Sequence, residues 1–184
     1  HFISVDGVLF SNNKSQLIQY PIGNQRTSYT IPKETIQIVS SAFYNCYYLQ
    51  SIKVESGNTK FSSNEGILYN NDKTYLIQYP IGNKQEIHSM IDNVQIIGDE
   101  AFYGNKYLQS LTITDTVKII GHRAFDNCNS LTSVTFIGAH KPQLNGINVF
   151  SKQTLTDKIK VPKQYEIEST EQNQNQHTLV LMLN

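Results

Sequence analysis

The 184-residue chain contains no tryptophan, only two cysteines and no net charge, because 15 Lys and Arg balance 15 Asp and Glu. Only 16% of the residues are charged and neither sign forms a run, so the sequence offers no basic stripe for nucleic acid and no acidic solvating tail. The apolar segment at residues 179–183 is far shorter than the roughly 20 residues of a membrane-spanning helix. Apolar residues make up 39% of the chain, with 11 tyrosines and 8 phenylalanines, which is enough for a thin core.

Motifs of catalysis are also missing. The chain has no G-x-S-x-G, no H-E-x-x-H, no glycine-rich phosphate loop and no paired carboxylates at a recognisable spacing. His88, His122 and His140 form no zinc-type spacing with each other or with the cysteines, so we expect them to be solvated or in loops. The sequence therefore predicts no enzyme, no metal and no cofactor.

What the sequence does contain is one segment three times. Residues 96–111 recur 23 residues later and also 59 residues earlier. The later copy is marked by Ile119, Ile120, Gly121, Ala124, Phe125, Leu131 and Val134, and the earlier copy by Ile38, Ala42, Phe43, Tyr44, Leu49 and Ile52. The same large and small apolar residues at a fixed period indicate stacked repeats rather than one globular core.

The first two copies belong to long units of 59 residues, residues 2–60 and 61–119, in which residues 17–24 and 76–83 are identical. The extra residues of each unit predict a β-hairpin, with β-prone runs at 7–10 and 17–20 in the first unit. Asn and Asp in the intervening turns tolerate the left-handed backbone of a tight turn. We expect the proline after each second strand, Pro21 or Pro80, to end it.

The short unit predicts one coil of a solenoid. Its strands are expected at 49–54, 108–113 and 131–136, where alternate apolar residues point inward. The return path carries Val117, Ile120, Ala124 and Phe125, a mixed spacing that suits a turn and a short helix. The predicted fold is an α/β repeat: a leucine-rich repeat solenoid with a parallel β-sheet on one face, short helical or irregular return segments, and inserted β-hairpins.

The predicted domain organisation is a single solenoid over residues 1–165 with a tail or cap at 166–184. It comprises long units 2–60 and 61–119, a short unit 108–131 and degenerate units 131–165, where Val149-Phe150 replaces Ala-Phe and residues 159–162 form a last strand. Phe2 falls where Phe61 falls in the next unit, so we expect the chain to begin inside a repeat of a longer protein, with any leader or anchor outside it.

These residues resemble the BspA-like leucine-rich repeat family, the Treponema-type class with a 23-residue period. Its approximate pattern is I-P-x-x-V-x-x-I-G-x-x-A-F-x-x-C-x-x-L-x-x-V. The pattern is matched by Ile31, Pro32, Ile36, Ala42, Phe43, Cys46, Leu49 and Ile52, and again by Val117, Ile120, Gly121, Ala124, Phe125, Cys128, Leu131 and Val134. The resemblance covers about residues 2–162 and includes the hairpins. The departures are Asn105 at a Cys position, Thr114-Asp115 where Ile-Pro is usual, and the segment after Phe136.

The resemblance implies a location and a function class. Family members are surface-exposed or secreted proteins of bacteria and of protozoan parasites such as trichomonads, so a trichomonad-like parasite or an anaerobic bacterium is the expected source. The family is associated with adhesion and has no shared catalytic residues. The implied partner is a host or matrix protein, or another cell-surface protein; the residues do not define an oligomeric state.

The two cysteines occupy equivalent positions of different coils. Neighbouring strands lie about 4.8 Å apart, and the Asn105 coil separates Cys46 from Cys128. A separation of about 10 Å or more exceeds the roughly 4.4–6.8 Å between Cα atoms that a disulfide spans. We therefore expect two buried free thiols.

The candidate protein-binding surface is the outward face of the strands. Its residues are Gln50, Ser51, Lys53, Gln109, Ser110, Thr112, Thr132, Ser133 and Thr135. Solenoid sheets present many side chains to a partner at once, but a row of Ser, Thr and Gln also suits a merely soluble face, which leaves a structural spacer or stalk as the alternative. The face lacks Tyr, Trp and Arg anchors.

Two further features of the hairpins could contribute to function. Their tyrosines, Tyr20, Tyr69, Tyr75 and Tyr79, could anchor a partner, but we expect them to be buried against the coils. Asn13-Lys14-Ser15 at a hairpin turn is the only N-glycosylation sequon, and it is modifiable only if a eukaryote secretes the chain.

Overall fold

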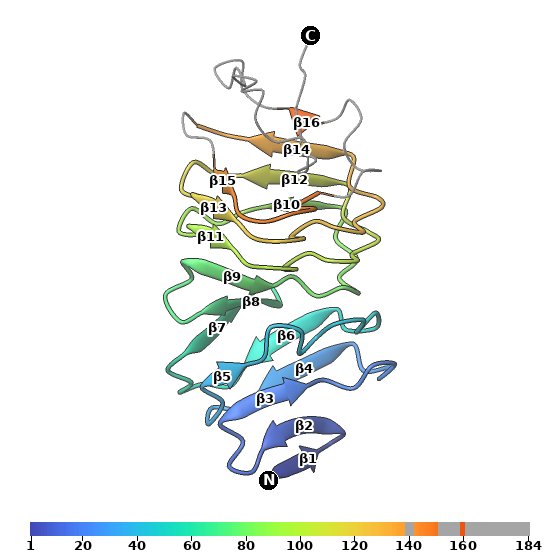
Figure 1. Ribbon diagram of the computed structural model, residues 1–184, viewed down its shortest axis with the longest axis vertical. Helices are drawn as coiled ribbons and strands as arrows, with labels where there is room; N and C mark the ends of the chain where they lie inside the picture. Colours follow the sequence, from blue (N-terminus) through green and yellow to red (C-terminus); the bar gives the residue numbers. More distant parts are fainter. Residues whose placement is uncertain (139–141, 151–158, 161–184) are drawn as a thin grey trace.

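The computed structural model describes residues 1–138, 142–150 and 159–160, which form β coils stacked from the N-terminal end upward (Figure 1). The strands are β1 (Phe2–Val5), β2 (Val8–Ser11), β3 (Gln16–Gln19), β4 (Ser28–Ile31), β5 (Gln37–Ile38), β6 (Ser51–Val54), β7 (Phe61–Asn64), β8 (Ile67–Asn70), β9 (Tyr75–Gln78), β10 (Ile87–Ser89), β11 (Ile96–Ile97), β12 (Ser110–Ile113), β13 (Ile119–Ile120), β14 (Ser133–Phe136), β15 (Gln143–Leu144) and β16 (Ile159–Lys160).

Each long unit opens with a strand that was not predicted, β1 or β7, and the predicted hairpin, β2-β3 or β8-β9, follows it. In β1-β2-β3 and β7-β8-β9 every neighbouring pair is antiparallel. The turn between the first two strands holds Asp6 and Gly7 at φ of 51° and 84°, and Glu65 and Gly66 at 51° and 79°. Two consecutive left-handed residues are what a two-residue type I′ turn requires. The first strand was not predicted, although an acidic residue followed by glycine between two β-prone runs is a sequence signal for such a turn.

The coils contribute parallel strands to two sides of the stack. On one side β4 pairs with β6, and β10, β12, β14 and β16 form a four-stranded sheet, here called the front sheet. Its register keeps the 23-residue period, since Leu111 lies opposite Val134. The predicted parallel sheet is therefore confirmed, although the second hairpin divides it.

The return segments contain no helix in the part of the chain that the structure describes, so the expected short helices are wrong. Instead, β9, β11, β13 and β15 pair in parallel as a second sheet, with Ile97 opposite Ile120. The turns that follow hold Glu100, Arg123 and Asn127 at φ of 51–59°, a left-handed conformation that a right-handed helix does not contain. Within the described residues no helix has the length and apolarity needed to cross a membrane.

The core is a column of stacked aromatic rings. Ring centroids lie 4.7 Å apart for Tyr79 and Phe102, 5.0 Å for Phe102 and Phe125, and 5.0 Å for Phe125 and Phe150. Phe125 and Phe150 also form a parallel bridge, which confirms Val149-Phe150 as the degenerate Ala-Phe pair. Ala101, like its equivalents, is buried and leaves room for the rings of neighbouring coils.

The second hairpin separates the core into two clusters. One holds the buried residues of the first unit together with Leu68, and the other begins at Ile67 and extends to Phe150. Cys46 lies in the first and Cys128 in the second, so both are free and buried as expected. Burial raises the pKa of each thiol to about 12, which leaves both protonated at neutral pH.

Candidate functional site

The front sheet presents small polar side chains outward. Ser110 lies opposite Ser133 and Thr112 opposite Thr135, each partly exposed, while the alternating residues on the same strands are buried. Two rows of short hydroxyl side chains therefore run across β12 and β14. These side chains are short and uncharged.

Residues that flank the rows extend this surface. Gln109 and Thr132 are exposed just before β12 and β14, and the Thr132 hydroxyl donates to the Gln109 carbonyl at 3.3 Å. On β10, Ile87 lies opposite Ser110 and is 72% exposed, and Ser89 lies opposite Thr112. Ile87 and Ser89 were not predicted, because β10 lacks the L-x-x-L spacing by which the other strands were recognised.

The remaining predicted residues lie on a different sheet. Ser51 and Lys53 belong to β6, which pairs with β4, and Gln50 directly precedes it. The amide of Ile52 donates to the carbonyl of Gly66 at 2.8 Å, so the second hairpin continues the stack at this point. The structure therefore does not bring Gln50, Ser51 and Lys53 together with the residues on β12 and β14.

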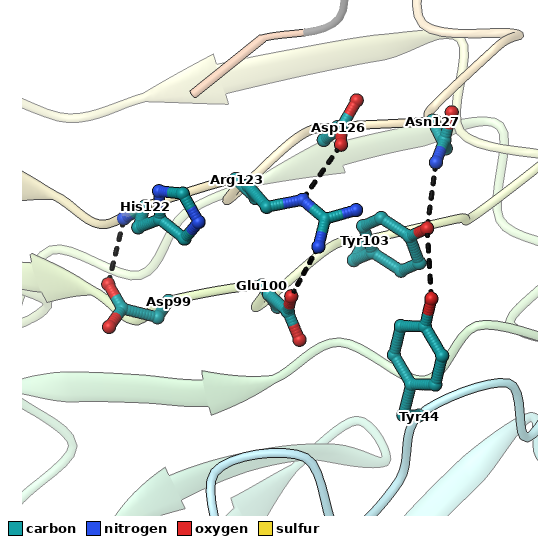
Figure 2. Close-up of polar contacts among 8 residues, drawn as sticks. All are labelled: Tyr44, Asp99, Glu100, Tyr103, His122, Arg123, Asp126 and Asn127. Carbon is teal, nitrogen blue, oxygen red and sulfur yellow. Dashed lines mark hydrogen bonds and ion pairs between the residues drawn. The ribbon is translucent and has the colours of Figure 1, made fainter. Parts of the chain in front are cut away.

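A cluster of charged side chains lies on the return turns (Figure 2). Arg123 contacts Glu100 at 3.0 Å and Asp126 at 2.9 Å, and its guanidinium carbon lies 4.6 Å from the Tyr103 ring centroid. Hydrogen bonding to Asp126 is the largest cause that raises the pKa of Arg123. Both carboxylates share the one guanidinium, and the pair with Glu100 ties two consecutive coils together.

A ladder of polar groups continues from Tyr103 (Figure 2). Its hydroxyl lies 3.3 Å from that of Tyr44 and accepts a bond of 2.8 Å from the Asn127 amide. Tyr44 and Tyr103 are equivalent residues of the two long units, and their rings stack with centroids 5.2 Å apart. The ladder thus connects three turns across the second hairpin.

The titratable residues do not assemble into a metal or catalytic site. Among the described residues no group of three or more His, Cys, Asp or Glu is positioned to hold a metal ion. The backbone amide of His122 donates to the Asp99 carboxylate at 2.8 Å, which is a turn contact. His140 lies outside the described residues.

His88 is buried, which contradicts the expectation of a solvated histidine. Only 5% of it is exposed, its ring lies 5.3 Å from that of Tyr79, and its Nε2 has no hydrogen-bond partner in the structure. It occupies the inward position that Leu111 fills one coil later. Burial lowers its pKa below the usual 6.5, and the nearby Glu65 only partly opposes the shift.

Acid should therefore destabilise the protein through His88. The unfolded chain binds a proton at this residue near pH 6.5, whereas the folded chain binds it only at lower pH, so stability should fall as the pH drops below about 6.5. Urea unfolding of the wild type and of His88→Leu between pH 7.5 and 5 tests this expectation. His88→Leu, which copies the residue of the next coil, should lose less stability over that range; parallel curves for the two proteins would contradict it.

Stacked coils with this 23-residue period and this side-chain pattern define a leucine-rich repeat β-solenoid. Residues 22–91 and 82–178 match the family model described as the BspA type leucine rich repeat region, in six copies. The chain therefore belongs to the BspA-type leucine-rich repeat family. A comparison with curated proteins gives no match.

Solved structures share the fold. The pneumococcal vaccine antigen PcpA superposes with a TM-score of 0.68 at 20% identity, over 84% of this chain and 44% of that one. A leucine-rich cell surface protein of Faecalibacterium prausnitzii gives 0.61 at 20% identity, over 82% and 48%. A leucine-rich repeat protein of Eubacterium ventriosum gives 0.56 at 23% identity, over 64% and 37%. The chain thus spans less than half the length of each of these proteins.

Proposed function

We propose that the chain is a non-enzymatic protein-binding module of a cell-surface or secreted protein, and that it mediates adhesion through the front sheet. The partner is a host or matrix protein, or another cell-surface protein, and residues 1–165 act as one unit. The location is supported by family membership and by the similar fold of a protein described as a leucine-rich cell surface protein. No catalytic role is assigned, because burial keeps both thiols protonated and the charges around Arg123 are paired.

The observation that carries the proposal is the continuous uncharged surface of β10, β12 and β14. Its outward residues are Ile87, Ser89, Ser110, Thr112, Ser133 and Thr135, flanked by Gln109 and Thr132. Short side chains on paired strands lose little conformational entropy when a partner covers them. Charged residues are depleted from the centres of protein interfaces, and none stands among these positions.

A spacer that only holds another domain away from a surface is the second candidate. The features that favour it are the aromatic column and the polar ladder of Tyr44, Tyr103 and Asn127 (Figure 2), since both fix the coils relative to one another along the stack. A spacer requires this stacking but no recognition by the outward side chains.

The double substitution Thr112→Arg with Thr135→Arg separates the two candidates. Two bulky charges in the middle of the sheet should weaken binding to matrix proteins or cultured host cells about 10-fold or more, the effect of disturbing an interface centre. Binding is measured on a panel of immobilised matrix proteins and on cells, with thermal unfolding as the check on folding. The matched control is Gln95→Arg with Gln143→Arg, which adds the same charge at exposed positions of the return side. Equal binding by both variants, or no binding by the wild type, would favour the spacer.

A further inference from the structure

Two tyrosines from different units are in direct contact on the return turns (Figure 2). Tyr44 and Tyr103 are equivalent residues of the two long units, 59 residues apart in the chain. Their ring centroids are 5.2 Å apart with an angle of 24° between the ring planes, and their hydroxyl oxygens are 3.3 Å apart. Since the oxygens are closer than the centroids, the rings converge at their hydroxyl ends, where the carbons ortho to each hydroxyl also lie.

The surrounding contacts hold this geometry. The Asn127 side chain donates to the Tyr103 hydroxyl at 2.8 Å, and the Arg123 guanidinium carbon lies 4.6 Å from the centroid of the Tyr103 ring. These contacts fix one ring of the pair, and the stacking and the hydrogen bond between the hydroxyls fix the other ring against it. Both side chains are partly exposed and line one surface recess, so small molecules in the solvent can reach the phenols.

Another close tyrosine pair among the residues that the structure describes is arranged differently. The centroids of Tyr20 and Tyr29 are 5.1 Å apart, but their ring planes are inclined at 59° and Tyr20 is completely buried. The Tyr20 hydroxyl has no hydrogen-bond partner in the structure, so it does not contact the Tyr29 hydroxyl. Stacking, contact between the hydroxyls and access from solvent therefore occur together at Tyr44 and Tyr103 and not at Tyr20 and Tyr29.

We propose that Tyr44 and Tyr103 are a modification site, at which a one-electron oxidant of the peroxidase class, acting with hydrogen peroxide, joins the two rings as dityrosine. Each phenol gives up one electron and one proton, which leaves two tyrosyl radicals. The radicals couple through the carbons ortho to their oxygens, and the hydrogen on each of these carbons then moves through solvent to the oxygen, which restores both phenols. The two electrons and two protons released reduce one hydrogen peroxide to two waters.

A cross-link at this position would join two parts of the fold that the cysteines do not connect. The second hairpin divides the core into two clusters; Tyr44 directly follows a phenylalanine of the first cluster, and Tyr103 a phenylalanine of the second. Cys46 and Cys128 are free and buried in different clusters. A bond between residues 44 and 103 closes a long loop in the unfolded chain and lowers its entropy, so it should stabilise the folded protein.

Oxidation of the purified wild type in dilute solution with a peroxidase and hydrogen peroxide tests the proposal. The monomer, separated from coupled oligomers by gel filtration in denaturant, should show dityrosine fluorescence. Its tryptic digest should contain peptides 34–53 and 85–106 joined together, with a mass lower by two hydrogen atoms than the sum of the two. Tyr44→Phe and Tyr103→Phe keep the ring and remove the phenol, so each variant should lose this cross-linked product.

Two control variants separate this pair from neighbouring tyrosines. Tyr47→Phe with Tyr48→Phe removes the other phenols of peptide 34–53, both of which are exposed, and Tyr29→Phe removes one phenol of the tilted pair. Both controls should retain the product. The linked wild-type monomer should unfold about 5 °C or more above the untreated protein, the scale of a typical covalent cross-link in a chain of this size. Oxidised Tyr44→Phe should show no such rise.

The proposal is overturned if the oxidised wild-type monomer carries no link between the two peptides, if Tyr103→Phe keeps the linked product, or if the product disappears with Tyr47 and Tyr48 instead. An unchanged unfolding temperature of the linked monomer would reject the stabilising role. Thermal unfolding before oxidation establishes that each variant is folded. The pair lies on the return turns and not on the front sheet, so none of these outcomes decides the adhesion proposal, which the Thr112 and Thr135 substitutions test separately.

Discussion

Replacing Phe102 with alanine should lower the free energy of unfolding by about 3–5 kcal/mol, the usual cost of removing a fully buried aromatic ring. Phe102 is completely buried, and its ring lies between those of Tyr79 and Phe125, 4.7 Å and 5.0 Å away between centroids. Its loss removes contacts to two neighbouring coils at once. Because each coil of a repeat protein is stabilised mainly by its neighbours, the defect should weaken the whole second core cluster.

Urea unfolding followed by far-UV circular dichroism measures this effect. Phe2→Ala is the matched control, since Phe2 is 70% exposed and the same substitution there should change stability by less than about 0.5 kcal/mol. Equal effects of the two substitutions would show that the aromatic column contributes little. Phe43→Ala, at the equivalent position of the first cluster, should also be strongly destabilising because only 3% of Phe43 is exposed.

The repeated apolar residues were sufficient to predict the stacking of the coils, because only inward positions are constrained to the same size in every unit. That is why Phe102 and Phe125, and even the degenerate Phe150, could be aligned before their rings were seen in contact. The same spacing could not distinguish a helical return from a turn. Glu100 and Arg123 take left-handed conformations that no apolar pattern records.

The candidate site was only partly predictable, because the sequence pattern shows which residues point outward but not which strands lie side by side. Alternation along each strand identified Ser110, Thr112, Ser133 and Thr135 as outward residues, and the structure places them side by side. Alternation carries no information on which strands become neighbours, so it could not show that the hairpin separates Lys53 from them. Exposed residues such as Ile87 lie outside any packing constraint and left no signal in the repeat.

Asn105, which departs from the Cys of the family pattern, is explained by its contacts. It is fully buried; its side-chain nitrogen donates to the carbonyls of Pro80, Ile81 and Asn83 at 3.1–3.3 Å, and its oxygen accepts from two backbone amides at 2.8–2.9 Å. A cysteine offers one weak donor and could not serve this many groups. Cys128, one coil later, makes one such bond, to the carbonyl of Phe102 at 3.0 Å.

The backbone shows why the two long units differ at this position although residues 17–24 and 76–83 are identical. Gly23 takes a φ of +81°, as the third residue of a type II turn requires, whereas Gly82 is not in that region. A Cβ on Gly82 would lie only 2.4 Å from the Tyr47 carbonyl oxygen, so the backbone of the preceding coil packs directly against this turn. The Pro80 carbonyl accepts from the Asn83 amide at 3.0 Å, and Asn105 donates to it and to the carbonyls of Ile81 and Asn83.

Asn105→Ala should therefore lower the free energy of unfolding by about 3 kcal/mol or more, because each buried polar group left without a partner costs roughly 1–3 kcal/mol. Asn105→Cys, which restores the family residue, should recover only part of this loss. Cys128→Ala, measured in parallel by urea unfolding, provides the scale for removing a small buried side chain with a single hydrogen bond, and its effect should be smaller. A stable Asn105→Cys protein would contradict the explanation, since it would mean that the turn at Gly82 can satisfy its own carbonyls. A large loss of stability in Asn105→Cys would show instead that this coil is adapted to the hairpin that precedes it in the stack.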